Sequence, residues 1–163
     1  MNAADLLTAA KAKGVMLATA ESCTGGMLSA AITDIPGSSA IFDRAFVTYT
    51  NAAKMQMLDV KQATLDAYGA VSEEVAAQMA KGVLAHSNAD IAVAITGIAG
   101  PGGSEHKPEG RVCFAVAGPA GVVTETVEFG ALGRDKVRAA ARDHGLALFC
   151  QAITMLHAED KRS

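Results

Sequence analysis

The sequence predicts an α/β fold in which helices cover both faces of a mixed β-sheet. Two observations support this prediction. Short apolar runs rich in β-branched residues alternate along the chain with longer segments that carry helix start and stop signals. The last two strand patterns are joined by residues 118–121, a length that favours an antiparallel hairpin. Alternating strands and helices favour parallel pairing, so the single hairpin makes the predicted sheet mixed.

Length and composition are typical of a compact chain with one domain over residues 1–163. Half of the 163 residues are hydrophobic, 19% are charged, and the formal net charge is −3. This balance provides no general basic surface for nucleic acid. No apolar run approaches the ~20 residues of a membrane helix, and the N-terminus lacks the order of a signal peptide. We therefore expect a cytoplasmic protein with no nucleic-acid or membrane partner.

Cysteines and histidines give no sign of a disulfide framework or a metal centre. The three cysteines are Cys23, Cys113 and Cys150, and no two of them form a CxxC pair. None of the four histidines has metal-ligand spacing with another histidine or with a cysteine. We expect free thiols, no metal and no cofactor.

Helices and strands alternate over the first part of the chain. Asp5 lies in the first turn of the first helix and Gly14 ends it, while Pro36 ends the second helix. Asn51 and Ser72 are the expected N-caps of two later helices. The predicted elements are a helix over 3–13, a strand over 15–19, a helix over 25–35, a strand over 45–50, helices over 51–58, 61–67 and 72–87, and a strand over 91–96.

The second part of the chain begins with a glycine-rich loop over residues 97–109. Loops of this length without regular structure are uncommon in compact domains and are usually functional. Strands follow over 111–117 and 122–129, and a last helix runs from about 134 to 157. Gly145 is expected to weaken the middle of that helix.

A polar loop with the sequence Ala-Glu-Ser-Cys-Thr-Gly-Gly occupies residues 20–26, between the first strand and the second helix. Backbone N–H groups at a helix start carry a partial positive charge, so anions and nucleophiles are often held there. Ser22 is a candidate nucleophile, although Ser22 or Thr24 fits a helix cap equally well. Cys23 is the competing nucleophile. Because no histidine is near in sequence to activate it, we interpret Cys23 as a packing residue.

A serine nucleophile needs a base, and Lys54 has an unusual position for a lysine. If Asn51 caps the helix, Lys54 lies in the first turn, where the helix dipole disfavours a cation. Partial burial would lower its pKa further, so that it can accept a proton from serine, as in Ser-Lys hydrolases. The alternative is a surface lysine in a poor position. Tyr49 either supplies a proton relay or is a core aromatic with its hydroxyl at the rim.

Two further segments offer groups that bind anions. The glycines of the loop over 97–109 allow close backbone approach to a ligand, although a merely flexible loop is the alternative. The loop has neither the P-loop nor the Rossmann pattern. Arg134, Arg138 and Arg142 repeat every four residues at the start of the last helix. They suit a phosphate group or else form a solvated face.

Taken together, these segments resemble one known family. The matching segments are, in chain order, residues 20–26 (AESCTGG), 36–39 (PGSS), 47–51 with Lys54, 69–72 (GAVS), 96–103 (TGIAGPGG), 107–108, and 133–135 with Arg138. In this order and spacing they are similar to the CinA C-terminal domain family, the stand-alone nicotinamide-mononucleotide amidohydrolases. The resemblance extends from about residue 5 to residue 155.

The resemblance implies a three-layer α/β/α sandwich with a mixed, mostly parallel sheet. It also implies hydrolysis of the carboxamide of nicotinamide mononucleotide to nicotinate mononucleotide and ammonia, in pyridine-nucleotide salvage. By position, Ser22 matches the nucleophile, Lys54 the general base and Tyr49 a supporting hydroxyl. The expected substrate-binding residues are Thr24, Gly25, Gly26, Ser39, Thr96, Gly97, Gly100, Arg134 and Arg138. Family members are typically oligomeric, so we expect a homo-oligomer, a dimer or larger, with a small nucleotide as substrate.

Two positions depart from the family pattern. The segment Ser104-Glu105-His106 varies among relatives and is assigned no role, and Arg111 either adds a cation near the site or lies on the surface. The nucleotide-processing domain often fused upstream in relatives is not expected here, nor is its pyrophosphatase activity. The alternative function is a non-catalytic nucleotide-binding module linked to competence or DNA damage. Lys54 discriminates between the two functions, because a non-catalytic binding module does not need a lysine placed beside Ser22.

Overall fold

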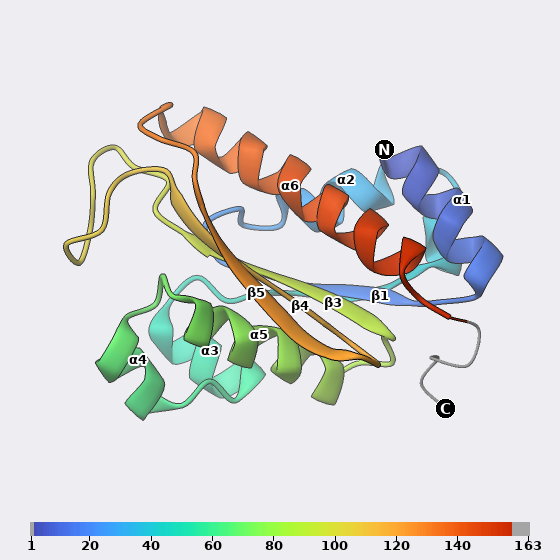
Figure 1. Cartoon of the computed structure of the whole chain (residues 1–163), viewed down its shortest axis with the longest axis horizontal. Coiled ribbons are helices and arrows are strands. Elements are labelled where there is room, and N and C mark those ends of the chain that lie inside the picture. The colour runs from blue at the N-terminus through green and yellow to red at the C-terminus, as the bar shows by residue number, and fades with distance from the viewer. Residues whose placement is uncertain (1, 158–163) are drawn as a thin grey trace.

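The computed structural model describes residues 2–157, so Met1 and residues 158–163 of the predicted domain lie outside the described residues. Figure 1 shows one sheet between two layers of helices. One face is covered by α1 (Ala3–Lys13), α2 (Met27–Thr33) and α6 (Arg134–Thr154). The other face is covered by α3 (Asn51–Leu58), α4 (Gln62–Tyr68) and α5 (Glu73–Ala85). The predicted three-layer α/β/α sandwich is confirmed.

The sheet has five strands in the order β2-β1-β3-β4-β5. Their bounds are β1 (Leu17–Glu21), β2 (Phe42–Val47), β3 (Ile91–Gly97), β4 (Arg111–Gly118) and β5 (Gly121–Glu128). β1 pairs in parallel with β2 and β3, while β4 is antiparallel to β3 and β5. Four strands therefore run in one direction, which confirms the mixed, mostly parallel sheet. The predicted hairpin joins β4 to β5, with Gly118 paired directly to Gly121.

The two faces of the sheet carry side chains of different size. Successive side chains of a strand point to opposite faces, so each central strand contributes to both cores. Large side chains pack beneath α1, α2 and α6, among them Leu17, Val93, Ile95 and Phe114. Small side chains pack against α5, among them Ala18, Ala20, Ala92, Ala94, Ala115 and Ala117. The alanine face lets α5 lie close to the sheet.

The first two strands are shifted from their predicted positions. β1 continues to Glu21 rather than ending at residue 19, because Ala20 and Glu21 still pair with β2 and β3. The Glu21 carboxylate accepts backbone N–H groups of Leu28 and Ser29, both at 2.9 Å. β2 ends at Val47 rather than at residue 50. The carbonyls of Thr48 and Tyr49 leave the ladder and accept hydrogen bonds from a side chain instead.

Several helix ends differ from their predicted positions. Thr50, not Asn51, is the N-cap of α3, and its hydroxyl accepts the Ala53 N–H at 3.1 Å. α2 begins at residue 27 rather than 25, because Gly25 (φ 58°) and Gly26 (φ 110°) have left-handed backbone conformations outside the helix. A short 3-10 helix, η1 (Ser38–Ala40), precedes β2. α6 ends at residue 154 rather than 157 and is continuous through its glycine.

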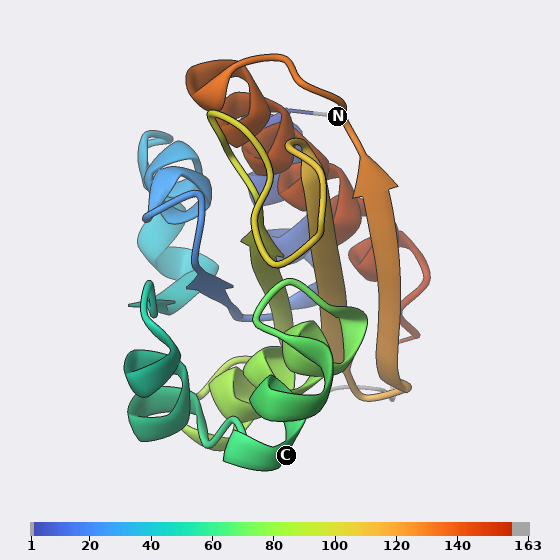
Figure 2. The same ribbon diagram turned by 90° about the vertical axis from the view of Figure 1, so that its left-hand side faces the viewer.

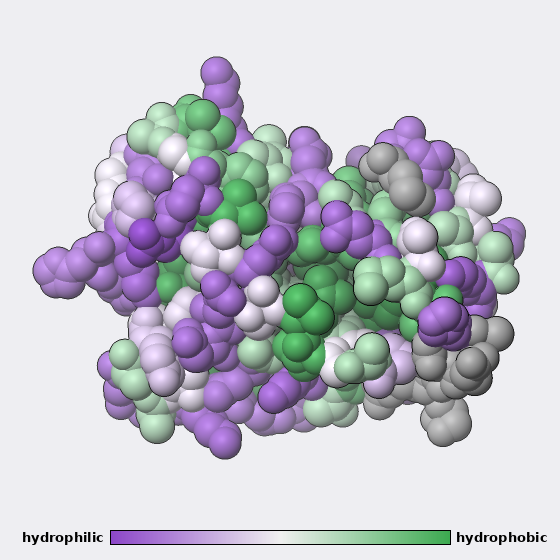
Figure 3. Space-filling model, viewed as in Figure 1, coloured by the Kyte–Doolittle hydropathy of each residue, from purple (hydrophilic) through white to green (hydrophobic). Residues whose placement is uncertain are grey.

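Between residues 2 and 157, no helix is long and apolar enough to cross a membrane. Figure 3 shows one face of the molecule, with hydrophilic residues prominent at the end where the loop between β3 and β4 projects in Figure 1. That same end carries the pocket described next.

Candidate active site

A pocket of about 350 Å³ opens where the parallel strands β1, β2 and β3 end. The carboxyl ends of parallel strands share one edge of a sheet, so segments far apart in sequence meet there. Figure 2 looks onto this edge, with the loop between β3 and β4 in front. The wall is formed by residues 22–23 after β1, Tyr49 and Lys54, residues 70–71, the loop over 96–105, and Arg134 of α6.

Ser22 and Lys54 lie in direct contact in this pocket. Lys54 Nζ is 3.0 Å from Ser22 Oγ, 2.9 Å from the Thr48 carbonyl oxygen and 3.2 Å from that of Tyr49. Only 1% of Lys54 and 8% of Ser22 are exposed. The structure thus joins the candidate nucleophile to the candidate base, which lie 32 residues apart in sequence.

Burial changes the chemistry of the Lys54 amine. Desolvation lowers the pKa of Lys54 from 10.5 to about 8, while nearby Cys23 and Glu105 act weakly in the opposite direction. Lys54 also lies in the first turn of α3, where the helix dipole disfavours a cation. At pH 7 a group with a pKa of about 8 is neutral in roughly one molecule in ten. This arrangement can accept a proton from a serine hydroxyl.

Cys23 is a poor competitor for the role of nucleophile. It lies beside Ser22 and lines the pocket, but only 5% of it is exposed. Burial raises the pKa of the Cys23 thiol to about 11, so the reactive thiolate is rare at neutral pH. The other two cysteines are also buried, and all three are free.

Glu21 is a site-supporting residue that the sequence did not single out. Its side chain is fully buried, and its two carboxylate oxygens accept the backbone N–H groups of Leu28 and Ser29, the second and third residues of α2. Charge-assisted hydrogen bonds of this kind are stronger than neutral ones, and a helix N-terminus favours an anion. Neither Ser22 nor Thr24 caps α2, because Glu21 takes that place. The Ser22 hydroxyl is therefore left for Lys54.

Arg138 holds the same loop from the opposite side. Its guanidinium donates to the carbonyls of Cys23 (3.0 Å) and Thr24 (3.3 Å). A Cβ atom on Gly25 would come within 3.3 Å of this guanidinium. Arg138 thus contacts the back of the loop and does not line the pocket, whereas its neighbour on the helix, Arg134, does.

Arg134 connects three parts of the pocket wall. It donates to the Gly100 carbonyl at 2.7 Å and to the Tyr49 hydroxyl at 2.8 Å. Arg134 is the first residue of α6 and is exposed, as is Tyr49, so its charge faces the open part of the pocket. Arg142, the third arginine of the predicted stripe, pairs instead with Asp143 on the surface.

The loop after β3 is fastened to its neighbours. The Thr96 hydroxyl donates to the Ala70 carbonyl at 2.9 Å. The Glu109 carboxylate accepts N–H groups of Gly102 (2.7 Å) and Gly133 (3.0 Å), and so ties the loop to the start of α6. Thr96 lines the pocket, and so do the predicted glycines at 97 and 100. A Cβ atom on Gly100 would lie 2.5 Å from the Glu109 carboxyl carbon, which is why a glycine is needed there.

Several predicted site residues do not line the pocket. Thr24, Gly25 and Gly26 lie just behind it, in the loop that carries Ser22. Ser39 is exposed in η1, before the start of β2 and hence at the opposite end of the sheet. Arg111 forms a cross-strand ion pair with Glu128 at 2.6 Å, away from the pocket. Within residues 2–157, no three His, Cys, Asp or Glu side chains gather as a metal site.

A serine hydroxyl in contact with a buried lysine, at the carboxyl edge of an α/β sheet, defines a class of site suited to nucleophilic attack. A sequence model of the CinA C-terminal domain matches residues 2–153. The chain belongs to the CinA C-terminal domain family.

Similar proteins agree with this membership over most of the chain. The nicotinamide-nucleotide amidohydrolase PncC of Enterobacter agglomerans is 58% identical over 123 residues, 74% of this chain and 75% of the relative. The protein of the same name from Escherichia coli K12 is 51% identical over 144 residues, 88% and 87% of the two chains. The crystal structure of the competence/damage inducible protein CihA from Agrobacterium tumefaciens superposes with a TM-score of 0.89 at 46% identity, covering 94% and 93%.

Proposed function

We propose that this chain is an amidohydrolase that converts nicotinamide mononucleotide to nicotinate mononucleotide and ammonia, in the salvage of pyridine nucleotides. The observation that carries the proposal is the buried Lys54 amine 3.0 Å from Ser22 Oγ. The names of the relatives at 58% and 51% identity supply the substrate.

In the first step, neutral Lys54 takes the proton of the Ser22 hydroxyl as Oγ attacks the carboxamide carbon. The C=O electron pair moves onto oxygen, and a tetrahedral intermediate forms. When the intermediate collapses, the C–N bond breaks and the proton held by Lys54 passes to the leaving nitrogen, directly or through Tyr49. Ammonia departs, and the nicotinoyl group remains as an ester on Ser22.

The oxyanion of the intermediate needs N–H donors that are not already used. Four amides of this region are engaged with other partners, namely those of Gly25, Met27, Leu28 and Ser29. The amides of Thr24 and Gly26 are in the loop that carries Ser22, just behind the pocket wall, and we propose that the oxyanion formed on attack by Ser22 Oγ points toward them. In the second step, Lys54 takes a proton from water as the water oxygen attacks the ester carbon. The C–Oγ bond then breaks, Lys54 returns the proton to Ser22 Oγ, and nicotinate mononucleotide leaves.

Arg134 is the proposed phosphate ligand. It is exposed at the N-terminus of α6, where the helix dipole also favours an anion. The glycines of the loop over 97–103 allow the ribose phosphate to approach the backbone. Arg138, which donates to the Cys23 and Thr24 carbonyls, is proposed to orient the loop that carries Ser22.

The test is release of ammonia from nicotinamide mononucleotide, with nicotinate mononucleotide measured by chromatography. Ser22→Ala should lower kcat by about a thousandfold or more, because the nucleophile is lost. Lys54→Arg should do the same, because an arginine stays protonated. Cys23→Ala is the matched control and should keep activity within about tenfold. Circular dichroism would show that each variant is folded.

The outcomes separate the alternatives. If Ser22→Ala stays active while Cys23→Ala is inactive, the nucleophile is the thiol and the mechanism is wrong. If the native chain releases no ammonia yet binds the nucleotide, the non-catalytic binding module is correct. The name of the Agrobacterium relative, a competence/damage inducible protein, is the observation that favours that second candidate.

The assembly state and compartment belong to the same proposal. We propose a cytoplasmic homo-oligomer, a dimer or larger. The buried, free state of all three cysteines is consistent with a reducing compartment. Size-exclusion chromatography with light scattering measures the assembly state, and a mass of one chain would contradict it.

A further inference from the structure

Glu105 places a carboxylate on the wall of the active-site pocket. It comes from the loop between β3 and β4 and lines the same cavity as Ser22 and Lys54. Among residues 2–157, no hydrogen bond and no ion pair within 4 Å involves this carboxylate. A Cβ atom on Gly69 would lie 2.5 Å from Glu105 Oε2 and 3.0 Å from Lys107 Nζ, so this amine is near the carboxylate without forming an ion pair with it. Lys107 donates to two backbone carbonyls instead, and the Glu105 carboxylate oxygens keep their acceptor sites for a ligand.

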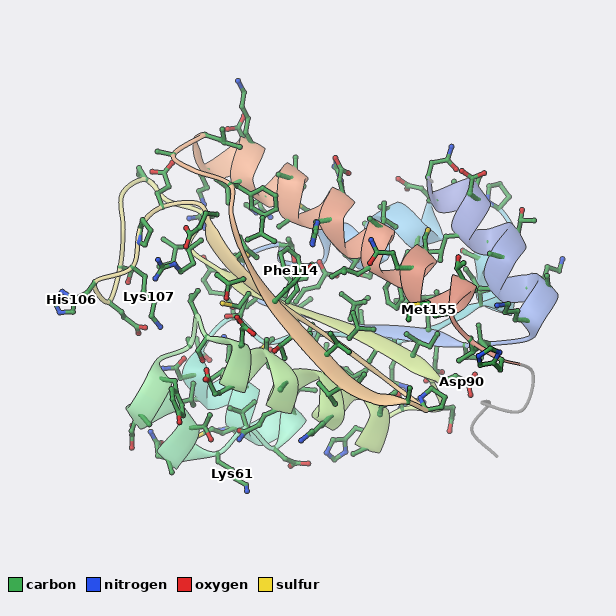
Figure 4. The ribbon with its side chains drawn as sticks, in the orientation of Figure 1. Lys61, Asp90, His106, Lys107, Phe114 and Met155 are labelled. Atoms are coloured by element: carbon green, nitrogen blue, oxygen red, sulfur yellow. The ribbon has the colours of Figure 1, made fainter. Side chains whose placement is uncertain are left out.

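Hydrogen bonds made by neighbouring residues of the loop hold Glu105 in place. Lys107 Nζ donates to the carbonyls of Tyr68 (2.7 Å) and Val71 (2.6 Å), beside the pocket. Backbone hydrogen bonds of 2.9 and 2.8 Å between Ser104 and Lys107 close a tight turn around Glu105. Figure 4 shows His106 at the tip of this turn, pointing away from the body of the protein, with Lys107 behind it.

The backbone of Glu105 is itself unusual. Its φ of 52° lies in the left-handed region, which residues other than glycine rarely adopt. A turn of this kind is kept only where the surrounding contacts over-determine it, and such turns cluster at ligand sites. The position of Glu105 is thus fixed by the turn and not by a partner for its carboxylate.

The pocket has opposite charges on different walls. Arg134 is the cation proposed for the phosphate, and Glu105 is the anion, close enough to Lys54 for its charge to act on the pKa of that amine in the upward direction. The nucleotide of the proposed function carries the matching charges. Its phosphate is anionic, and its pyridinium ring, quaternary at nitrogen, is cationic.

We propose that the Glu105 carboxylate recognises the positive charge of the pyridinium ring and makes this pocket selective for nucleotides with a cationic ring. This inference rests on the proposed function. Two unit charges about 5 Å apart at a protein surface interact strongly enough to change affinity by about five- to tenfold. If Glu105 were only a solvated loop residue, its removal would affect cationic and neutral ligands equally.

The test compares two nucleotides that differ in ring charge. Nicotinamide mononucleotide has a cationic ring, whereas its 1,4-dihydro form has the same carboxamide, ribose and phosphate on a neutral ring. For the native chain and Glu105→Gln, KM for the first and the inhibition constant of the second are measured at about 20 mM and 500 mM salt. Asp34→Asn, at the far end of α2, is the control for the same change in net charge.

We expect Glu105→Gln to raise KM for nicotinamide mononucleotide by about five- to tenfold at low salt, and by less than about twofold at high salt, because ions screen exposed charges. The inhibition constant of the dihydro form should change by less than about twofold. Equal changes for both nucleotides, or none for either, would overturn the role of Glu105. If the native chain releases no ammonia, the proposed function fails, and titration calorimetry of both nucleotides still decides whether Glu105 selects ring charge.

Discussion

The number of protons on Lys54 decides what Ser22 can do. A protonated amine has three donors and no acceptor, whereas a neutral amine has two donors and one lone pair. Around Nζ the structure places two carbonyl oxygens and the Ser22 hydroxyl. Both forms of the amine satisfy these three neighbours. Only the neutral form makes the hydroxyl the donor, which is the arrangement that nucleophilic attack requires.

The pH dependence of activity follows from the protonation state of Lys54. Because burial lowers the pKa of Lys54 to about 8, the neutral base becomes more abundant as the pH rises through 8. We expect kcat/KM to increase about tenfold per pH unit below that value and to level off above it. Rates measured from pH 6 to 10 would show the profile. A plateau already reached below pH 7 would contradict an essential base with this pKa.

At the scale of single residues, part of the site is predictable from the sequence and part is not. Lys54 is recognisable because a lysine in the first turn of a helix is locally unfavourable. The role of Glu21 is not, because its partners, Leu28 and Ser29, belong to a helix that begins after two left-handed glycines. An acidic residue in a predicted loop, several residues before the helix, has no local signature of a helix cap.

At the scale of elements, types were predictable and boundaries were not. Every predicted helix and strand is present, because periodicity and end signals are local. β2 ends early because the Thr48 and Tyr49 carbonyls accept hydrogen bonds from the Lys54 side chain, six and five residues later in the chain. That exchange depends on α3 packing onto the sheet, which no local pattern encodes.

Gly82 gives an element-scale prediction in which propensity and packing disagree. From helix propensity alone, Gly82→Ala in the last turn of α5 should stabilise the protein by about 1 kcal/mol. In the structure, a Cβ atom there would lie 2.1 Å from the Leu58 carbonyl oxygen, at the end of α3. Because backbone must move, we expect a net loss of about 2–4 kcal/mol in the free energy of unfolding.

Urea unfolding would measure the effect of Gly82→Ala. Lys81→Ala, at the next position and exposed, should change the free energy of unfolding by less than about 0.5 kcal/mol and serves as the control. Activity should fall as well, since α3 also carries Lys54. A Gly82→Ala protein as stable as the native chain would mean that α3 and α5 are not packed this closely.

At the scale of the whole molecule, topology assembles the site. Ser22, Lys54, Thr96 and Arg134 come from four separate segments, and three of these follow or lie near the carboxyl ends of the parallel strands. A single sequence does not specify which segments meet, so Ser22 and Lys54 can be paired from the sequence only by their complementary chemistry and by the family pattern. The same pattern included Ser39, which the topology places at the other end of the sheet.

Because the pocket wall is built from several elements, a bound nucleotide should stabilise the whole fold. At 100 times its dissociation constant, a ligand of the native state adds about 2.7 kcal/mol to the free energy of unfolding. For a chain of this size that is a rise in Tm of about 5–10 °C. Nicotinate mononucleotide, the proposed product, suits the measurement because it is not consumed. Arg134→Met should lose most of this rise, since it removes the proposed phosphate contact.

The matched control for Arg134→Met is Lys136→Met, an exposed cation two residues further along α6 and so directed to another side of the helix. It removes the same charge and should keep the full rise in Tm. Arg134 also joins α6 to Gly100 and Tyr49, so the ligand-free Tm of each variant must be measured and subtracted. An equal rise in Arg134→Met and the native chain would show that the phosphate is held elsewhere. A rise lost equally in both variants would show that net charge, and not this arginine, governs binding.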